Sequence, residues 1–323
     1  MKKNIYITRT IPEVGINLLK EKGYKVTVSK KNKVPTKEEL INALSKKKYD
    51  AVVSLLTDHI NVDVLNVCPN VKIIANYAVG FNNIDVEEAE KRGIVVTNTA
   101  GTSSQAVAEH TVALMFAVTT RLVEGDRFVR KGKFKGWDPN LLMGLDISKK
   151  TIGVIGLGAI GKKVGHILKK GFDCKIIYND IKRDDSFEND CGGEYMSIDE
   201  VLKNADIVTL HVPLLPSTKH LINKEKISLM KRTAIIINTS RGPVVEEEAI
   251  VEALKEKRIY GAGLDVFEFE PHISDEFKKL DNIVMTPHIA SSRASAREEM
   301  ATLVAKNIID VLEGGKGITP VKL

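Results

Sequence analysis

Three segments in the second half of the sequence place an ionisable side chain just after a short apolar run. Arg241 lies in NTSRG, Glu270 in FEFEP and His288 in TPHIAS. In a parallel sheet the carboxyl ends of the strands gather at one edge, where ligands bind. A cation can hold and polarise an anionic substrate, and a histidine beside a carboxylate can move a proton. These residues are therefore predicted to form an acid–base site for an anionic substrate.

A glycine-rich turn precedes this set in the chain. The apolar run TIGVI leads directly into Gly156, Gly158 and Gly161, and an amphipathic stretch follows at once. In a strand–turn–helix unit of this kind the first glycine permits a tight turn, the second lets the backbone approach a pyrophosphate, and the third lets the helix pack close to the strand. The N–H groups at the start of that helix, including those of Ala159 and Ile160, favour phosphate. The pattern predicts a dinucleotide-binding unit.

The next apolar run, KIIYND, ends in Asp180, which lies 19 residues after Gly161. An acidic residue at this place is suited to bind the ribose hydroxyls of the adenosine, and its charge repels a 2′-phosphate. NAD is therefore expected in preference to NADP, although Lys182 and Arg183 nearby leave NADP open.

The elements that must position these residues alternate between short apolar runs and amphipathic stretches, which is typical of α/β folds with parallel sheets. Strands are expected at 4–9, 24–29, 51–56, 71–78 and 94–99, and in a second series at 151–156, 175–180, 207–212, 234–240, 261–266 and 283–287. Helices are expected at 12–22, 36–47, about 103–124 and about 292–313, with an irregular segment at 125–149. The 323 residues exceed one ordinary core, so we expect two domains with a ligand cleft between them.

Composition excludes several other classes. The chain has 48 basic and 42 acidic side chains, with no basic stripe, so nucleic acid is not an expected partner. Three dispersed cysteines without a C-x-x-C pair indicate neither a disulfide framework nor a metal site. No signal peptide and no apolar run long enough to span a membrane is present, which favours a cytoplasmic protein.

The sequence resembles the D-isomer-specific 2-hydroxyacid dehydrogenases over nearly its whole length. The motifs TIGVIGLGAIG, HVPLLPSTKHLIN, NTSRGPVVEEEAI, GAGLDVFEFEP and TPHIAS occur in the family's order. The resemblance implies two doubly wound parallel-sheet (Rossmann-like) domains with a cleft between them. Residues 1–100 and 290–323 would form the substrate domain, and 101–289 the NAD-binding domain. The helix and arm at 103–149 would form a homodimer surface, since a helix that is apolar on all sides needs cover on all sides.

The resemblance also implies roles for single residues. His288 would donate a proton to the substrate carbonyl while NADH delivers hydride, Arg241 would bind the substrate, and Glu270 would favour the protonated form of His288. Glu268 stays a minor alternative to Glu270, which is preferred because it directly precedes a proline, as in the family. The substrate would also contact Leu55, Val79 and Gly80. Beyond the glycine turn and Asp180, the cofactor would contact His211, Val212, Pro213, Thr218, Thr239, Ser240, Arg241, Asp265, His288, Ala290 and Ser291.

The remaining histidines carry no companion signal, and we expect structural or surface roles for His59, His110, His166, His220 and His272. Trp137 could pack in the arm or cover the substrate pocket.

The expected reaction is NAD(P)H-dependent reduction of a small 2-oxo acid, glyoxylate or hydroxypyruvate, to the D-2-hydroxy acid. Family members that oxidise 3-phosphoglycerate commonly carry an arginine where this chain has Ser54–Thr57, a segment without a cation. A phosphoglycerate dehydrogenase is therefore the second enzyme hypothesis, and formate dehydrogenase ranks lower because it has glutamine at the position of Glu270. A non-catalytic NAD-sensing scaffold is the hypothesis from another class.

Overall fold

A computed structural model describes residues 2–321 of the chain. The chain divides into two compact units. One contains the residues up to Ser103 together with those from Ser292 onward, and the other contains Ser104–Ser291.

The first unit has a five-stranded sheet in which all neighbouring strands are parallel. The strand order is β2-β1-β3-β4-β5. The strands are β1 (Asn4–Ile7), β2 (Lys25–Val28), β3 (Ala51–Leu55), β4 (Ile73–Tyr77) and β5 (Val95–Thr97). The central strands β3 and β4 are nearly continuous apolar runs, because both of their faces are covered.

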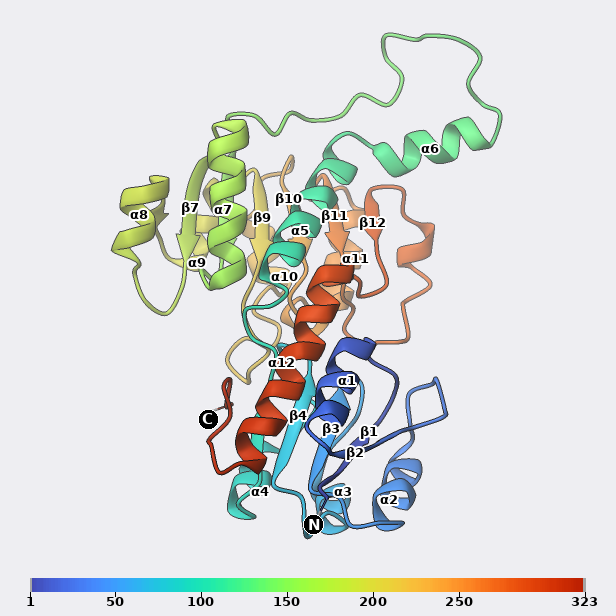
Figure 1. Cartoon of the computed structure of the whole chain (residues 1–323). Coiled ribbons are helices and arrows are strands. Elements are labelled where there is room, and N and C mark those ends of the chain that lie inside the picture. Colours follow the sequence, from blue (N-terminus) through green and yellow to red (C-terminus); the bar gives the residue numbers. More distant parts are fainter. Residues whose placement is uncertain (1, 322–323) are drawn as a thin grey trace. The chain divides into compact units, whose positions relative to one another are not determined.

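Helices cover both faces of this sheet (Figure 1). One face packs against α1 (Glu13–Glu21) and α12 (Ala294–Leu312), and the other against α2 (Lys37–Ser45), α3 (Val62–Asn66) and α4 (Val86–Lys91). Side chains of β1 alternate between the two cores, with Ile5 and Ile7 on the α12 side and Tyr6 on the α2 side. The end of the chain therefore completes the unit that the beginning of the chain starts.

The second unit has a seven-stranded parallel sheet in the order β12-β11-β10-β9-β6-β7-β8. The strands are β6 (Thr151–Ile155), β7 (Lys175–Asn179), β8 (Glu194–Tyr195), β9 (Ile207–Leu210), β10 (Ile235–Asn238), β11 (Gly261–Leu264) and β12 (Ile283–Met285). The chain moves outward from β6 in one direction through β7 and β8, and returns to the other side of β6 with β9. The carboxyl ends of β6 and β9 thus form a topological switch point, the place where open α/β sheets bind ligands.

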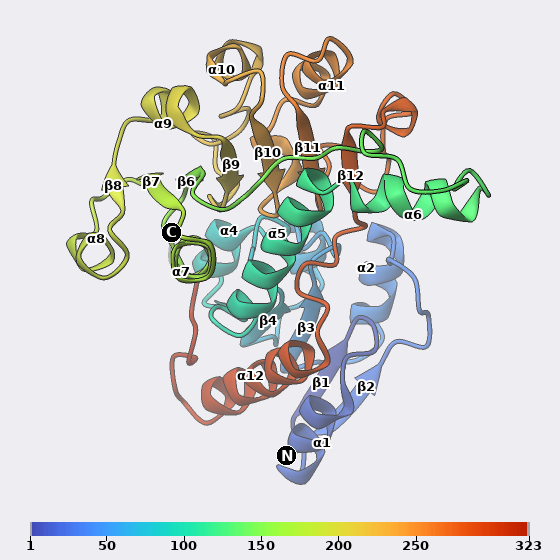
Figure 2. The same cartoon turned by 90° about the horizontal axis from the view of Figure 1, so that it is seen from above.

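Helices again lie on both faces (Figure 2). The core on one face includes residues of α5 (Ser104–Thr119), α7 (Ala159–Phe172) and α8 (Asp185–Cys191). The core on the other face includes residues of α9 (Ile198–Asn204), α10 (Lys224–Leu229) and α11 (Glu247–Lys255). The two predicted parallel-sheet domains of doubly wound type are confirmed.

The prediction of one helix over 103–124 followed by an irregular segment from 125 is wrong. The helix ends at Thr119, Arg121 adopts a left-handed φ of 54°, and α6 (Leu122–Arg130) begins at a bend of 60°. The apolar surface of α5 is covered by α7 and by strands of its own sheet. The all-round apolar pattern of α5 therefore has an explanation within one chain and does not by itself require a partner.

Among residues 2–321 no single helix is long and apolar enough to span a membrane. Only the bent pair α5 and α6 reaches that length and hydropathy when taken together.

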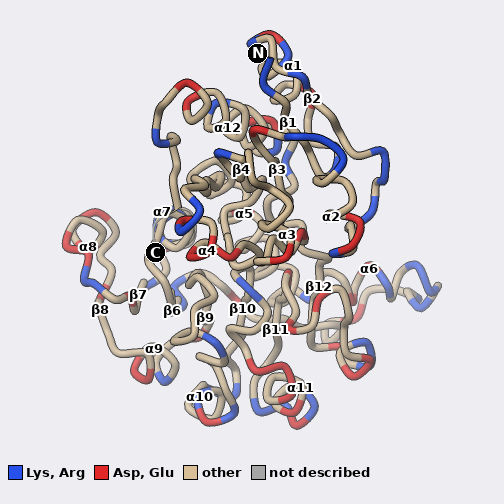
Figure 3. The backbone as a smooth tube through the Cα atoms, turned by 90° about the horizontal axis from the view of Figure 1, so that it is seen from below, with Lys and Arg blue, Asp and Glu red and all other residues tan. Residues whose placement is uncertain are grey.

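Lys and Arg are interspersed with Asp and Glu along the backbone of each unit (Figure 3).

Candidate active site

The glycine turn lies between β6 and α7, and its geometry requires two of the three glycines. Gly156 has a φ of 95°, and a Cβ there would lie 2.7 Å from the backbone carbon of His211. A Cβ on Gly161 would lie 2.2 Å from the carbonyl oxygen of Gly156. By contrast, a Cβ on Gly158 would meet no atom within 4 Å. The first and third glycines thus allow close packing, and the second borders open space.

The residues of this turn fit a dinucleotide pyrophosphate. Gly158 is the N-cap of α7 and supplies no side chain to the first N–H groups of the helix. Ala159 and Ile160 are thus the first residues of a helix whose N-terminus has no side-chain cap. Uncapped N–H groups and the positive end of the helix dipole at such a point favour a phosphate.

Asp180 follows β7 and hydrogen-bonds to this turn. Its Oδ2 accepts from the backbone N–H of Leu157 at 2.5 Å, and its Oδ1 accepts from Ile181 at 2.6 Å. The carboxylate thus orders the glycine turn itself, in addition to the role predicted for it. Arg183, one of the two cations that left NADP open together with Lys182, makes a bidentate ion pair with Glu188, with its closest contact at 2.6 Å.

The loop after β9 holds His211, Val212, Pro213 and Thr218. Nε2 of His211 lies 3.0 Å from Oγ1 of Thr209, and burial lowers the pKa of His211 to about 3. This imidazole is therefore neutral near pH 7 and does not act as an acid. The hydroxyl of Thr218 donates to the carbonyl of Pro213 at 2.6 Å and accepts from Leu215 at 2.8 Å, so it stabilises the loop that lies beside the glycine turn.

The segment after β10 is held by its own polar side chains. The hydroxyls of Thr239 and Thr111 lie 2.8 Å apart. Asn238 accepts from the hydroxyl of Ser240 at 2.8 Å and donates to the carbonyl of Arg241 at 3.0 Å. The Nη1 atom of Arg241 donates to the carbonyl of Ser240 at 2.6 Å. Burial lowers the pKa of Arg241, while the charge of Glu270 opposes that effect.

Glu270 and His288 come from different loops and form a hydrogen-bonded pair. Oε2 of Glu270 lies 2.8 Å from Nδ1 of His288, and Oε1 accepts from the backbone N–H of Phe267 at 2.9 Å. Among the described residues Glu270 is the only hydrogen-bond partner of the His288 ring, which leaves Nε2 for a substrate. The positive charge of Arg241 also lowers the pKa of the Glu270 carboxylate. The three predicted residues therefore come together in the second unit.

Glu268, the minor alternative, is engaged elsewhere. Its Oε1 lies 2.6 Å from Nε2 of His220, and its Oε2 accepts from the backbone N–H of Glu247 at 3.0 Å. The carboxylate of Glu247 in turn accepts from the backbone N–H of Glu268 at 3.2 Å. Glu268 thus fastens the segment that carries Glu270 without touching His288.

Asp265 lies at the end of β11, is fully buried, and binds the chain on both sides of His288. Its carboxylate accepts from the backbone N–H groups of Ile289 and Ala290, both at 2.8 Å, and from the hydroxyl of Thr286 at 2.6 Å. Its carbonyl accepts from the N–H of His288 at 2.9 Å. Ser291, the last predicted cofactor contact, ends the unit directly after this turn.

Two residues near the Asp265 carboxylate, His110 and Thr286, were not predicted to act in the site. His110 of α5 has its Nε2 3.0 Å from Oγ1 of Thr286 and 3.5 Å from Oδ1 of Asp265. His110 stands between Glu109 and Thr111 in the helix, and the sequence does not reveal which of these polar residues are buried or what that helix contacts.

The first unit contains the other predicted substrate residues, at the carboxyl ends of β3 and β4. Asn76 donates to the carbonyl of Gly80 at 2.8 Å, and Asn83 donates to the carbonyl of Leu55 at 3.1 Å. Asn98 donates to the carbonyl of Val79 at 2.8 Å. Among the described residues the N–H groups of Val79 and Gly80 have no acceptor. Backbone donors of this kind can bind an anion.

The supporting hydrogen bonds of Asn76, Asn83 and Asn98 were also not predicted from the sequence. Ser54 and Asn76 are buried polar residues inside apolar strands, and their side chains are hydrogen-bonded at 2.9 Å. Buried polar groups in a strand need partners, so their presence could have indicated a polar network behind the loop.

Comparisons with known proteins identify the family that this chain resembles. The family described as D-isomer specific 2-hydroxyacid dehydrogenase, NAD binding domain, matches residues 112–290. The chain is 46% identical over 318 residues to a glyoxylate reductase of Thermococcus litoralis, covering 97% of this chain and 95% of that protein. Among solved structures, the TT0316 protein of Thermus thermophilus matches with a TM-score of 0.92 and 38% identity, over 99% of this chain and 100% of that chain.

A further structural neighbour bears on the cofactor. An NADPH-dependent glyoxylate/hydroxypyruvate reductase of Sinorhizobium meliloti, in complex with NADP and malonate, matches with a TM-score of 0.87 and 27% identity, over 99% of this chain and 97% of that chain. The neighbours therefore include an enzyme that uses NADP.

Fold, site and comparisons together define an oxidoreductase with an NAD-binding domain that acts on the CH–OH group of small 2-hydroxy acids and reduces the corresponding 2-oxo acids. The chain belongs to the D-isomer-specific 2-hydroxyacid dehydrogenase family.

Proposed function

We propose that the protein reduces glyoxylate, hydroxypyruvate or a similar small 2-oxo acid to the D-2-hydroxy acid with NADH, and that His288 is the proton donor. The observation that carries this proposal is the 2.8 Å contact between Nδ1 of His288 and Glu270, because it orients the ring and leaves Nε2 for the substrate. NADH, when bound, supplies the hydride that attacks the carbonyl carbon.

Residues of the protein would donate the proton, bind the substrate and stabilise the charged form of the proton donor. As the carbon–oxygen double bond becomes a single bond, the electron pair moves to the oxygen, and Nε2–H of His288 donates its proton there. Arg241 would hold the substrate carboxylate and polarise the carbonyl. Glu270 would stabilise the imidazolium before the transfer. In the first unit, the N–H groups of Val79 and Gly80 would be donors suited to a substrate carboxylate.

For the cofactor we propose contacts along the carboxyl edge of the second sheet. The pyrophosphate would lie over the glycine turn, and Asp180 would accept from the ribose hydroxyls. The segments after β9, β10 and β12 would line the nicotinamide half. NADH is the preferred form in this proposal, because the Asp180 carboxylate repels a 2′-phosphate and Arg183 is already paired with Glu188.

The substrate choice rests on the charge near the end of β3. Arg9 is a cation in contact with this segment, with its Nη2 2.5 Å from Oγ1 of Thr57. It also lies 3.7 Å from the buried carboxylate of Asp58, which balances its charge. A phosphate dianion would therefore find no uncompensated cation here. An uncharged or hydroxylated small group suits the segment better.

Steady-state rates with a panel of 2-oxo acids, each with NADH and with NADPH, test the proposal. We expect turnover of glyoxylate and hydroxypyruvate and a preference for NADH. Rapid oxidation of 3-phosphoglycerate without turnover of either acid would instead identify a phosphoglycerate dehydrogenase. NADH binding without turnover of any acid would identify a scaffold.

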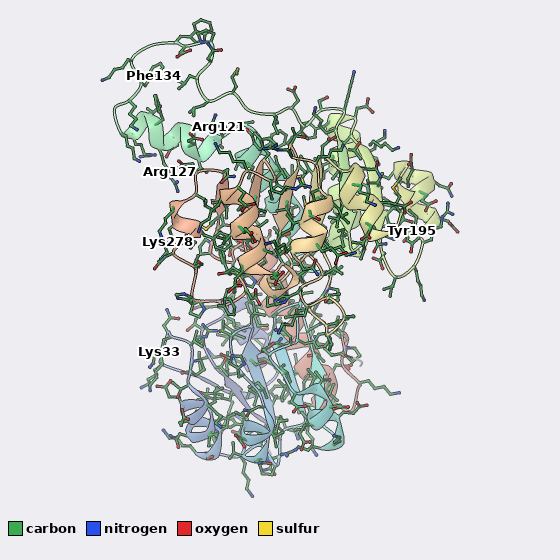
Figure 4. All side chains as sticks on the ribbon, turned by 180° about the vertical axis from the view of Figure 1, so that it is seen from behind. Lys33, Arg121, Arg127, Phe134, Tyr195 and Lys278 are labelled. Atoms are coloured by element: carbon green, nitrogen blue, oxygen red, sulfur yellow. The ribbon has the colours of Figure 1, made fainter. Side chains whose placement is uncertain are left out.

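We further propose a homodimer formed through α6 and the segment that follows it. No residue of α6 is buried, and Leu122, Val129, Phe134 and Trp137 are all more than half exposed, with Trp137 at 86%. Phe134 lies on the long loop beyond α6 (Figure 4). Light scattering should give twice the chain mass, and a stable monomer would contradict this proposal.

A further inference from the structure

His110 is a buried histidine on α5, a helix that contributes none of the predicted catalytic residues. Its Nε2 lies 3.0 Å from the hydroxyl oxygen of Thr286 and 3.5 Å from Oδ1 of Asp265. Thr286 directly follows β12 and stands two residues before His288. The contact therefore joins a core helix to the turn that presents the proton donor.

The direction of each hydrogen bond in this cluster follows from the chemistry of the groups. Asp265 accepts hydrogen bonds from the backbone N–H groups of Ile289 and Ala290, one at each carboxylate oxygen. Both oxygens of Asp265 therefore act as acceptors. The single proton of Thr286 lies toward Oδ1 of Asp265, at 2.6 Å. The oxygen of Thr286 must then accept from His110, so Nε2 of His110 carries a proton.

The charge state of Asp265 depends on the same cluster. Burial alone would raise the pKa of Asp265, but the hydrogen bonds from His110, Thr286 and the two backbone N–H groups lower it below its ordinary value. Asp265 therefore remains a carboxylate, which is the form that can accept all of these bonds.

The turn held by this carboxylate is strained. His288 adopts a φ of 54°, a left-handed conformation that residues with a Cβ rarely take. Such conformations persist only where surrounding contacts fix them. Here the N–H of His288 donates to the carbonyl of Asp265, and the N–H groups of Ile289 and Ala290 donate to its carboxylate.

We propose that His110 and Thr286 are positioning residues for the reaction: the relay from His110 through Thr286 to Asp265 fixes the turn at residues 286–290 and so aims the ring of His288. Neither residue touches the reacting atoms. The inference rests on the proposed function, in which His288 donates the proton. Small displacements of a catalytic group are costly, since about 1 Å of misplacement can lower a rate by about 100-fold.

Paired variants separate a positioning role from a purely structural one. Thr286→Val keeps the shape and removes the hydroxyl, whereas Thr286→Ser keeps the hydroxyl. His110→Phe removes the donor, whereas His110→Gln retains an N–H close to the place of Nε2. His166→Gln is the matched control, because His166 is a partly buried histidine on α7 whose ion-pair partner is Asp190.

For Thr286→Val and His110→Phe we expect kcat with glyoxylate or hydroxypyruvate to fall by about tenfold or more, while KM changes by less than about threefold. Thr286→Ser, His110→Gln and the His166→Gln control should keep most of the wild-type kcat. If Thr286→Val and Thr286→Ser have the same kcat, or if the loss lies in KM alone, the proposal is wrong.

A second measurement does not depend on activity. Hydrogen exchange of the Ile289 and Ala290 amides should be at least about tenfold faster in Thr286→Val and His110→Phe than in the wild type, with the amides of β6 unchanged. Imidazole nitrogen NMR should show a proton on Nε2 of His110. Unchanged exchange would overturn the relay even if the wild type were active. Faster exchange in a protein that reduces no 2-oxo acid would preserve the relay and reject the proposed function.

Discussion

The imidazole of His288 and the carboxylate of Glu270 form a fixed pair, with Nδ1 of the ring 2.8 Å from Oε2. The other carboxylate oxygen accepts from the backbone N–H of Phe267 at 2.9 Å, so Glu270 cannot turn away without losing a second bond. Burial would raise the pKa of Glu270, but the hydrogen bond and charge of His288, with the Phe267 amide and the charge of Arg241, hold that pKa below its ordinary value. Glu270 is therefore a carboxylate at the pH where the enzyme works.

Glu270→Gln tests the electrostatic part of this pair. Glutamine retains an oxygen for His288 but carries no charge, so the imidazolium loses its stabilising partner. Reduction needs a proton on the ring, and kcat/KM for 2-oxo acid reduction should therefore fall by about tenfold or more. Steady-state rates at about pH 7 measure this loss. A kcat/KM equal to that of the wild type would show that the Glu270 charge does not act on the proton donor.

His288→Gln tests the proton donor itself. Glutamine retains polarity and approximate size but cannot supply a proton, so kcat should fall by about 100- to 10,000-fold. In the proposed site NADH is bound mainly by other segments, so its affinity, measured by fluorescence titration, should change by less than about threefold. Retention of more than about a tenth of the wild-type kcat would assign the proton transfer to another group.

Three glycines of one turn and helix give a graded test of the dinucleotide site. Gly158→Ala should fold normally, because its Cβ meets nothing within 4 Å, yet the Cβ enters the space assigned to the pyrophosphate and should weaken NADH binding by about tenfold. Gly161→Ala should lose both stability and binding, since its Cβ would lie 2.2 Å from a backbone oxygen. Gly171→Ala, farther along the same helix and also in open space, is the control and should stabilise the protein by about 0.5–1 kcal/mol.

Thermal unfolding and NADH titration of the three glycine variants separate these outcomes. Equal NADH affinity in Gly158→Ala and Gly171→Ala would place the pyrophosphate elsewhere.

Much of the second unit could be predicted from the sequence, because its signals are local. The turn at Gly156 joins a buried strand to an amphipathic helix, and Arg241, Glu270 and His288 each lie in the loop that follows an apolar strand. Parallel strands place such residues at one edge whatever the details of packing.

The remaining features depend on contacts between distant segments, which composition and periodicity do not reveal. The sequence shows no reason for the helix to break at Arg121. This residue adopts a left-handed φ at the point where an apolar stretch is followed by an amphipathic one. The sequence favours Glu270 over Glu268 only through the proline that follows Glu270, and the structure shows that Glu268 is bound to His220 and Glu270 to His288. The contact between His110 and Thr286 spans 176 residues and was missed for the same reason.

Asp180→Ser tests the choice between NADH and NADPH. The variant removes the charge that would repel a 2′-phosphate, so kcat/KM with NADPH should rise relative to NADH by about tenfold or more. Because Asp180 also accepts from Leu157, the absolute NADH affinity should fall as the glycine turn loosens. Steady-state rates with each cofactor at fixed 2-oxo acid give both values. An unchanged ratio would mean that Asp180 serves only to order the turn.

Glu247→Gln tests whether a buried carboxylate beside the catalytic segment destabilises the fold. Burial and the charge of Glu268 raise the pKa of Glu247, although the backbone bonds from Glu268 and Ser274 oppose this. A raised carboxylate pKa means that the folded protein holds the proton more tightly than the unfolded chain does. The ionised form of Glu247 therefore destabilises the fold at higher pH, and this effect disappears as the pH falls through the folded and then the unfolded pKa.

Glutamine at position 247 keeps an acceptor for the Glu268 amide without the charge. Urea unfolding at about pH 7 should therefore show Glu247→Gln to be more stable than the wild type by up to about 1 kcal/mol, with the difference vanishing near about pH 4. Glu248→Gln, at the neighbouring exposed position, should show no such dependence. A less stable Glu247→Gln at about pH 7 would mean that the two backbone hydrogen bonds to the charged form outweigh its burial.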